Sequence, residues 1–169
     1  FEDVLELARL KMPDPYNLFS RRPVPLVTKE KVFQISERVR ADGSVKTPVD
    51  EASVQRAIDG VRAIDGEGVV IALLHAYRNP DHEHQVRDLL AKYAPDLSVT
   101  CSSDVWPVIR EYERTVTAVV AGYVQPRIAQ YLGSLQAALT AADVSAEPMV
   151  TKSNGGVMSA EAAKSDCVH

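Results

Sequence analysis

A strand–helix–strand pattern in the middle of the chain limits the folds open to it more than any other feature. VVIALL at residues 69–74 is a continuous apolar run, and LSVTCS at 97–102 is a second short strand candidate. Continuous apolar runs of this length are typical of strands that are buried on both faces of a sheet. Between them, a helical pattern begins at Pro80 and ends before Pro95. Two buried strands joined by a helix predict a parallel pair.

Flanking segments continue this alternation. Helical patterns occur at 47–65 and 107–143, and EPMVTK at 147–152 is a third strand candidate. Pro126 lies inside the second helical stretch and predicts a kink or a break into two helices. The order strand, helix, strand, helix, strand predicts an α/β fold with a mostly parallel sheet.

The N-terminal part of the chain is predicted to be less regular. FEDVLELARL at 1–10 has helical spacing, whereas residues 11–27 contain four prolines and cannot form a regular helix. We expect an extended connector on the surface there. KVFQISERV at 31–39 is predicted to be a strand that is closed by the turn pair Asp42-Gly43.

Composition and charge exclude several classes of protein. Of the 169 residues, 46% are hydrophobic and 25% are charged, which allows a packed core. A net charge of −4 without a Lys/Arg cluster argues against nucleic-acid binding, and no apolar run is long enough for a membrane helix. Cys101 and Cys167 lack the spacing of a metal site. With no signal peptide visible, we expect free thiols and a cytoplasmic protein.

Three of the four histidines lie in LLHAYRNPDHEHQ, residues 73–85, which raises the question of a metal site. His82 and His84 are two positions apart, so on a helix they would point about 200° apart and could not bind one ion together. The zinc pattern H-E-x-x-H is absent, and no third ligand joins His75 and His82. We therefore expect no metal here.

The same stretch begins where a predicted buried strand ends. In open α/β sheets, ligands bind beyond the carboxyl ends of the strands. His75 is therefore a candidate for proton transfer, and Arg78 for holding an anion. The alternative is structural: His75 bonds a backbone carbonyl, and Asn79 ends the loop and caps the next helix.

Two further segments concentrate polar or flexible residues. In REYERT at 110–115, Glu111 and Arg114 are three positions apart and can pair on one helix face, although a solvated helix start is the alternative. In KSNGG at 152–156, two glycines lie between a predicted strand and a predicted helix. Such a turn lets the backbone approach an anion at the helix N-terminus, but a tight strand–helix turn alone also explains it.

Five segments, taken in order, resemble the hydantoinase A / 5-oxoprolinase family. They are NLFSRRPVPLV, ERVRADGSV, LLHAYRNPDHE, REYERTVTAVVAGYVQP and SNGGVMS. The resemblance implies a fold similar to the actin-like ATPases, with two lobes of ribonuclease-H-like α/β fold. It also implies a helix end and Pro-rich connector at 1–28, the end of the N-terminal lobe at 29–145 and the start of the second lobe at 146–169.

The resemblance implies an activity as well. It is the ATP-dependent opening of a cyclic amide or imide ring, of the hydantoin or 5-oxoproline type, through a phosphorylated carbonyl. The alternatives are a subunit of an ATP-dependent ketone carboxylase and a non-catalytic assembly fragment. The family's D-x-G-G-T phosphate loops are absent from this sequence. ATP and Mg²⁺ are therefore expected to bind elsewhere in a longer subunit, and this chain alone is expected to be inactive. A hydantoinase B-type subunit is the implied partner in a hetero-oligomer.

The resemblance finally implies a cleft. Its catalytic candidates are His75 for proton transfer, Arg114 for holding a substrate carbonyl or phosphate, and Glu111. His82 and Glu83 are expected to fix the loop to the following helix. The residues expected to line the substrate or nucleotide cleft are Arg78, Asn79, Thr115, Ser153, Asn154, Gly155 and Gly156.

Overall fold

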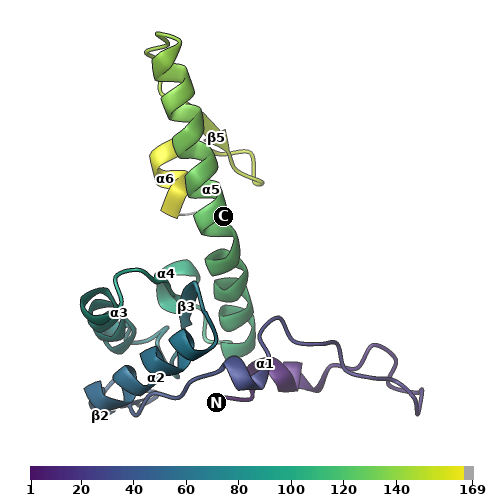
Figure 1. Cartoon of the computed structure of the whole chain (residues 1–169). Coiled ribbons are helices and arrows are strands. Elements are labelled where there is room, and N and C mark those ends of the chain that lie inside the picture. The colour runs from purple at the N-terminus through teal and green to yellow at the C-terminus, as the bar shows by residue number, and fades with distance from the viewer. Residues whose placement is uncertain (166–169) are drawn as a thin grey trace. The chain divides into compact units, whose positions relative to one another are not determined.

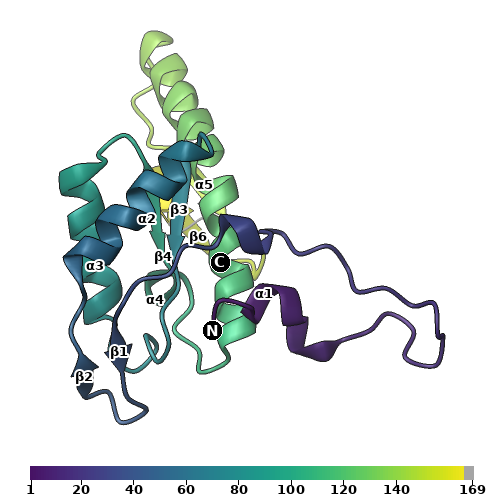
Figure 2. The ribbon, with the colours of Figure 1, turned by 60° about the horizontal axis from the view of Figure 1, so that its bottom comes forward.

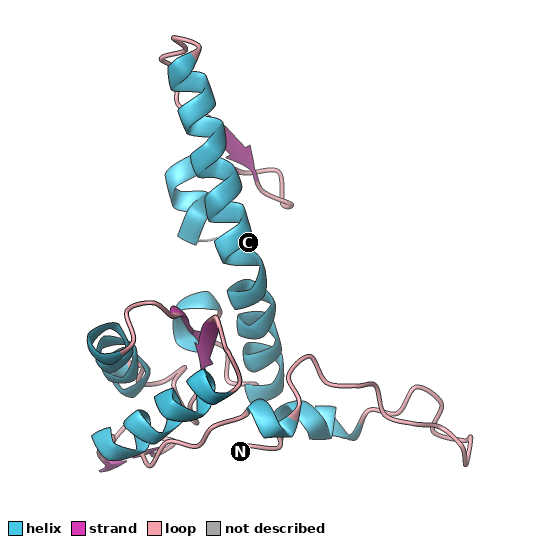
Figure 3. Cartoon of the chain, in the orientation of Figure 1, coloured by secondary structure: helices cyan, strands magenta, loops and turns pink. Residues whose placement is uncertain are grey.

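The computed structural model describes residues 1–165, and its contacts divide the chain into unit 1, Phe1–Val119, and unit 2, Val120–His169 (Figure 1). Cys167, one of the two expected free thiols, lies outside the described residues. Helices and loops make up most of the chain (Figure 3). The described strands form three two-stranded sheets, of which one is parallel and two are antiparallel. The α/β class is therefore confirmed, but the mostly parallel sheet is not.

The parallel pair is the predicted strand–helix–strand unit. β3 (Gly68–Ile71) pairs with β4 (Ser98–Cys101), and α3 (Asp81–Tyr93) connects them. A parallel connection must cross from one end of the sheet to the other, and a helix makes that crossing. Figure 2 shows α3 and α2 (Glu51–Ala63) beside this strand pair.

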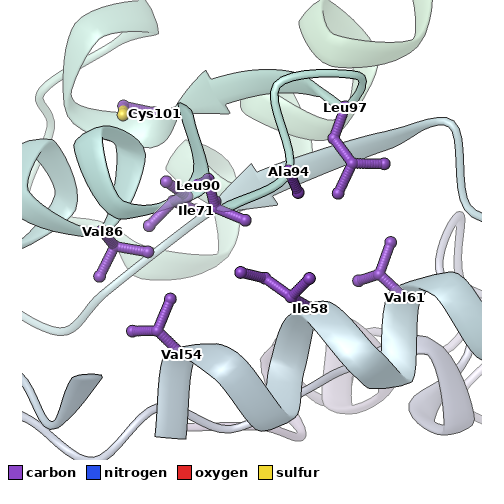
Figure 4. Packing of buried hydrophobic residues seen from close by; sticks show 9 residues of the cluster. All are labelled: Val54, Ile58, Val61, Ile71, Val86, Leu90, Ala94, Leu97 and Cys101. Carbon is purple, nitrogen blue, oxygen red and sulfur yellow. The ribbon is translucent and has the colours of Figure 1, made fainter. Parts of the chain in front are cut away.

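The core of unit 1 lies between these helices and the strand pair (Figure 4). Asp50 is the N-cap of α2, and its side chain accepts hydrogen bonds from the backbone N–H groups of Ala52 and Ser53. Its inward positions then recur every three or four residues. Burying a Val, Leu or Ile side chain contributes about 1.5–3 kcal/mol. The core residues are Val54, Ile58, Val61, Ile71, Val86, Leu90, Ala94, Leu97 and Cys101.

The turn pair Asp42-Gly43 closes a short hairpin, as predicted. β1 (Arg38–Val39) pairs antiparallel with β2 (Val45–Thr47). Gly43 has φ +89°, in the left-handed region that glycine adopts without strain.

The predicted strand at 31–39 is wrong over most of its length. A 3₁₀ turn, η2, covers Lys29–Lys31, and regular strand begins only at Arg38. Ser36 shows the reason: its N–H donates to Ser53 Oγ at 3.0 Å, and its C=O accepts from Asp50 N–H at 2.9 Å. The start of α2 thus provides the hydrogen bonds that a neighbouring strand would otherwise provide.

The Pro-rich connector has no helix or strand, as expected. It follows α1 (Val4–Leu7) and η1 (Ala8–Leu10). Tyr16 and Leu18 are almost fully exposed, so the connector lies on the surface.

A short helix, α4 (Ser102–Val105), precedes the long helix α5 (Glu111–Ala141). α5 continues through Pro126, so of the two predicted alternatives the break into two helices is wrong, and the kink stays a prediction. Proline removes one hydrogen bond and its ring crowds the carbonyl four residues earlier. That residue is Gly122, which carries no side chain and can adjust. No described helix, α5 included, combines the length and apolar character that crossing a membrane requires.

Unit 2 contains a β-hairpin, and the sequence predicted only the first of its two strands. β5 (Met149–Thr151) occupies the predicted third strand and pairs antiparallel with β6 (Val157–Ser159), which was not predicted. α6 (Ala160–Ser165) follows β6 directly. The unit's buried cluster is Leu132, Ala160 and Ala163, against which Ile128, Val150 and Met158 pack.

Candidate functional site

The loop after β3, residues 73–79, carries three of the predicted site residues. Its turn is closed at His75, whose C=O accepts from the N–H groups of Arg78 at 2.9 Å and Asn79 at 3.2 Å. The Asn79 side chain accepts from Asp81 N–H at 3.0 Å, at the start of α3, and donates to Gly43 C=O at 3.0 Å. Pro80 is the N-cap of α3, and the Asn79 side chain binds the first N–H of that helix and ties the loop to the β1–β2 hairpin.

His75 has two unusual features. Its φ of +61° is in the left-handed region, which non-glycine residues rarely adopt. Its Nδ1 atom is buried and has no hydrogen-bond partner among the described residues. The predicted alternative, in which His75 bonds a backbone carbonyl, does not account for this nitrogen. Buried polar atoms are normally hydrogen-bonded, so this nitrogen is an exception within the described structure.

Glu83 on α3 is fully buried, and its carboxylate accepts four hydrogen bonds. Oε1 accepts from Leu73 N–H at 2.8 Å and from Ser102 Oγ at 2.7 Å. Oε2 accepts from the N–H of Ser103 at 2.9 Å and from its hydroxyl at 2.8 Å. The expectation that Glu83 fixes the loop to the helix is confirmed.

Arg114 on α5 is also fully buried, and its side chain donates only to protein groups in the described structure. Nε donates to Ser102 Oγ at 3.1 Å, Nη1 to Val108 C=O at 2.9 Å and Nη2 to Leu73 C=O at 2.8 Å. Burial lowers the pKa of Arg114, and the negative charges of Glu83 and Glu111 oppose this shift. The predicted pairing of Glu111 with Arg114 is thus an electrostatic attraction that acts over a longer distance than a direct ion pair.

These residues form one buried network, here called the clamp: Glu83, Ser102, Ser103 and Arg114. Two opposite charges buried away from water need compensation, and the clamp provides it through hydrogen bonds to both side chains, a Ser102 hydroxyl that bridges them, and the attraction of the Glu83 charge for Arg114. The clamp binds both the N–H and the C=O of Leu73, so it fixes the backbone two residues before His75. Sequence reasoning missed Ser102 and Ser103, although two serines directly after a buried strand were a usable signal.

His82 was expected to share the role of Glu83, but the structure gives it a different partner. Its Nδ1 lies 2.7 Å from Glu37 Oε2, and both side chains are nearly buried. His82 therefore ties α3 to the segment before β1. His84 is half-exposed and lies 2.7 Å from Asp104 Oδ1. Within residues 1–165, no group of three or more His, Cys, Asp or Glu side chains could hold a metal ion.

The other predicted residues of unit 1 differ in their surroundings. Arg78 is exposed, and Glu111 is half-buried at the first position of α5. Thr115 is buried, and its Oγ1 lacks a hydrogen-bond partner within the described part of the chain. Unit 1 therefore brings together the loop at 73–79 and Arg114.

The remaining candidates, Ser153 to Gly156, lie in unit 2 as the loop of the β5–β6 hairpin. The predicted strand–helix turn is wrong here, because β6 separates the glycines from α6. Gly155, at φ +85°, donates its N–H to Lys152 C=O, and Gly156 donates to Asn154 Oδ1, both at 3.0 Å. These amides stabilise the hairpin loop rather than a helix N-terminus.

Comparison with known proteins adds a family to this geometry. Residues 1–94 match the family model described as hydantoinase/oxoprolinase N-terminal region, and residues 114–169 match the model described as hydantoinase/oxoprolinase. Together the two matches cover most of the chain.

Individual relatives agree with these matches. The chain is 32% identical to the caprolactamase subunit alpha of Pseudomonas jessenii, over 92% of this chain and 23% of that subunit. It is 32% identical to the acetone carboxylase beta subunit of Xanthobacter autotrophicus, over 80% of this chain and 19% of that subunit. The crystal structure of the ATP-dependent caprolactamase from Pseudomonas jessenii matches 92% of this chain and 23% of its own, with a TM-score of 0.81 and 33% identity. The chain thus spans about a quarter or less of the length of these relatives.

Proposed function

Because the chain belongs to the hydantoinase/oxoprolinase family, we propose that it is part of an ATP-dependent enzyme subunit that opens a cyclic amide or imide ring. The observation that carries this proposal is the structural match to an ATP-dependent caprolactamase over 92% of the chain. Caprolactam is itself a cyclic amide. In the proposed reaction, the γ-phosphoryl group of ATP is transferred to the ring carbonyl oxygen. ADP leaves, water adds to that carbon, and the ring C–N bond breaks as the nitrogen takes up a proton, which leaves an acyl phosphate. A second water then hydrolyses the acyl phosphate to a carboxylate and inorganic phosphate.

Within this proposal, the loop at 73–79 forms one wall of the substrate cleft. His75 moves a proton, because it has a buried ring nitrogen without a hydrogen-bond partner among residues 1–165. Arg78, exposed beside it, attracts an anionic group of the substrate or nucleotide. Arg114 acts by holding Leu73 rather than by contacting substrate, since all three of its nitrogens donate to protein acceptors.

The other predicted site residues have proposed roles as well. The negative charge of Glu111 stabilises the positive charge of Arg114. Thr115 follows Arg114 directly on α5. Within unit 2, Asn154 and the glycines of residues 153–156 are proposed to contact substrate or nucleotide. The 1–28, 29–145 and 146–169 division and the two-lobed actin-like fold remain part of this proposal.

ATP and Mg²⁺ are proposed to bind mainly outside residues 1–169, because the chain contains no D-x-G-G-T phosphate loop. A hydantoinase B-type partner is proposed because the relatives are named as subunits of larger enzymes. Such a partner would make the enzyme a hetero-oligomer.

The test is ATP hydrolysis by a purified subunit that contains this chain, together with any partner encoded beside it. The additions are 5-oxoproline, hydantoin, N-methylhydantoin, caprolactam, and acetone or acetophenone with bicarbonate. We expect a cyclic amide to stimulate ATP hydrolysis and to be opened in equal molar amount.

A second candidate function is supported by the acetone carboxylase relative. It predicts stimulation only by a ketone with bicarbonate, with ATP turnover dependent on both. If none of these compounds changes the rate of ATP hydrolysis, the proposed reaction is wrong and an assembly role becomes the better account.

A further inference from the structure

Two exposed apolar side chains, Trp106 and Ile109, lie in segment 106–110 between α4 and α5. Their exposed fractions are 41% and 62%, and neither belongs to a buried cluster of the described residues. A single exposed apolar residue needs no explanation. Here a tryptophan and an isoleucine are exposed close together in one short segment, so the position of that segment in the fold is informative.

The segment lies at the same end of the parallel strand pair as the loop at 73–79. β3 leads into that loop, and β4 leads through α4 into segment 106–110. Because β3 and β4 are parallel, their carboxyl ends meet at the same edge of the sheet. Ligands of open α/β sheets bind beyond that edge. Trp106 and Ile109 are therefore placed where a ligand is expected.

Arg114 holds the two loops next to each other. Its Nη1 donates to Val108 C=O at 2.9 Å, and its Nη2 donates to Leu73 C=O at 2.8 Å. Both bonds come from one planar guanidinium group, so the two carbonyl groups lie side by side. Val108 directly precedes Ile109, and Leu73 begins the loop that carries His75. The apolar pair and His75 are thus positioned by the same clamp.

The backbone of Trp106 is fixed although its side chain is exposed. Its N–H donates to Ser102 C=O at 3.1 Å, and its C=O accepts from Val108 N–H at 2.8 Å. Ser102 itself belongs to the clamp. A rigid aromatic side chain on a fixed backbone loses little conformational freedom when a ligand binds, so more of the contact energy remains as affinity.

The two loops differ in chemistry. The loop at 73–79 offers a ring nitrogen of His75 that is buried without a hydrogen-bond partner among residues 1–165, and the exposed guanidinium of Arg78. Segment 106–110 offers an indole ring and a branched aliphatic side chain. Small-molecule sites combine apolar and aromatic walls with a few polar groups in this way. A ligand that matches both loops carries a polar group and a hydrocarbon part within one small ring.

We propose that Trp106 and Ile109 bind the hydrocarbon part of a cyclic amide whose amide group faces His75. The inference rests on the proposed function and adds to it the residues that select the ring. It favours lactams, in which most ring atoms are methylene groups, over rings with several polar atoms. Each further methylene group that is buried against this pair is expected to raise the affinity about fourfold.

Fluorine NMR of a subunit that contains this chain tests the proposal directly. The subunit, with any partner encoded beside it, is labelled with 5-fluorotryptophan, and the Trp106 signal is identified by its absence from the Trp106→Phe variant. The probes are 2-pyrrolidinone, 2-piperidone and caprolactam, in which the ring grows by one methylene group at each step. We expect all three to shift the Trp106 signal to saturation, with affinity rising about fourfold at each step.

Ile109→Ala tests the second residue, and Ile64→Ala is its matched control. Ile64 is also exposed, at 46%, but it ends α2 before β3 begins and so lies toward the other end of that strand. We expect Ile109→Ala to weaken caprolactam binding at least about fivefold and 2-pyrrolidinone binding less. We expect Ile64→Ala to change neither affinity by more than about 1.5-fold.

Steady-state kinetics separates this role from a merely structural one. For a lactam that is turned over, Ile109→Ala should raise KM and leave kcat unchanged, because the lost contact is equally strong in the ground state and the transition state. A merely structural role would lower kcat for every substrate.

Three results would overturn the proposal. One is turnover of a cyclic amide without any shift of the Trp106 signal, which would leave the proposed function intact and place the ring elsewhere. Another is equal affinity for the three lactams, which would show that the hydrocarbon part is not bound. The third is the absence of both turnover and signal shift, which would contradict the proposed function as well. A saturable shift that depends on ring size, without turnover, would support the proposal and contradict the proposed reaction alone.

Discussion

Glu83 and Arg114 bind the two backbone polar groups of one residue, Leu73. Glu83 Oε1 accepts from the Leu73 N–H at 2.8 Å, and Arg114 Nη2 donates to its C=O at 2.8 Å. Ser102 joins the two side chains, donating to Glu83 and accepting from Arg114. The start of the loop that carries His75 is therefore fixed by three elements, α3, α4 and α5.

Replacing Glu83 with Gln should destabilise the protein strongly. The change removes the charge that compensates Arg114 and turns one acceptor into a donor that faces other donors. Breaking a buried charge network in this way costs about 3–5 kcal/mol. Urea unfolding followed by circular dichroism measures the loss. Glu161→Gln is the control, because Glu161 is exposed on α6, and we expect a change below about 0.5 kcal/mol. Equal stability of the two variants would show that the clamp is not energetically important.

Ser102→Ala should cost less, about 1–3 kcal/mol, because it leaves Arg114 Nε unpaired but keeps both charges. Ser98→Ala on the exposed side of β4 is its control. In a double-mutant cycle, Ser102→Ala and Glu83→Gln should lose less together than the sum of their separate losses. Additive losses would mean that Ser102 does not connect to Glu83 as described.

Replacing either of two glycines with alanine should change the free energy of unfolding, and the two changes should have opposite signs. At Gly43, φ is +89° and an added Cβ would lie 3.2 Å from Arg78 Cγ, so Gly43→Ala should cost about 1–2 kcal/mol. At Gly133, inside α5, no described atom beyond the neighbouring residues and the local helix backbone lies within 4 Å of an added Cβ, so Gly133→Ala should gain about 0.5–1 kcal/mol. Thermal unfolding of both variants tests this, and a neutral Gly43→Ala would contradict the close contact between the hairpin and the loop.

Cys101 should make stability fall at alkaline pH. Burial, assisted by the charges of Asp104 and Glu83, raises the pKa of its thiol from 9.0 to about 12. Between these values the unfolded chain loses a proton that the folded chain keeps, so the free energy of unfolding decreases as pH rises. Urea unfolding from about pH 8 to pH 10 should show a steeper decrease for the natural protein than for Cys101→Ala. Parallel curves would contradict a buried neutral thiol.

The parts of the fold that the sequence predicted are those with strong local signals. The apolar run at 69–74 and Pro80 identify β3 and the start of α3 without any tertiary information. The β5–β6 hairpin has weaker signals, because β6 is only three residues long and leads directly into α6. Its pairing depends on a contact across the loop that no local pattern specifies.

In the candidate site, too, residues with a local sequence signal were predicted, and features that depend on distant contacts were not. His75 and Asn79 were identified because they follow a predicted strand. The burial of Arg114 could not be predicted, since a charged residue near a helix start is normally solvated. Its partners lie 12 positions away at Ser102 and 41 positions away at Leu73, and only the folded chain brings them together.

The proposed role of His75 in the substrate cleft is tested most directly by comparing two histidine variants. In a subunit that contains this chain, cyclic-amide-dependent ATP hydrolysis is measured for His75→Asn and His84→Asn. Asparagine tolerates the left-handed backbone at His75, and His84 is a half-exposed histidine paired with Asp104. We expect at least about a 100-fold lower kcat for His75→Asn, with near-normal stability, and little change for His84→Asn. A His75→Asn enzyme with the natural kcat would contradict a role of His75 in the reaction.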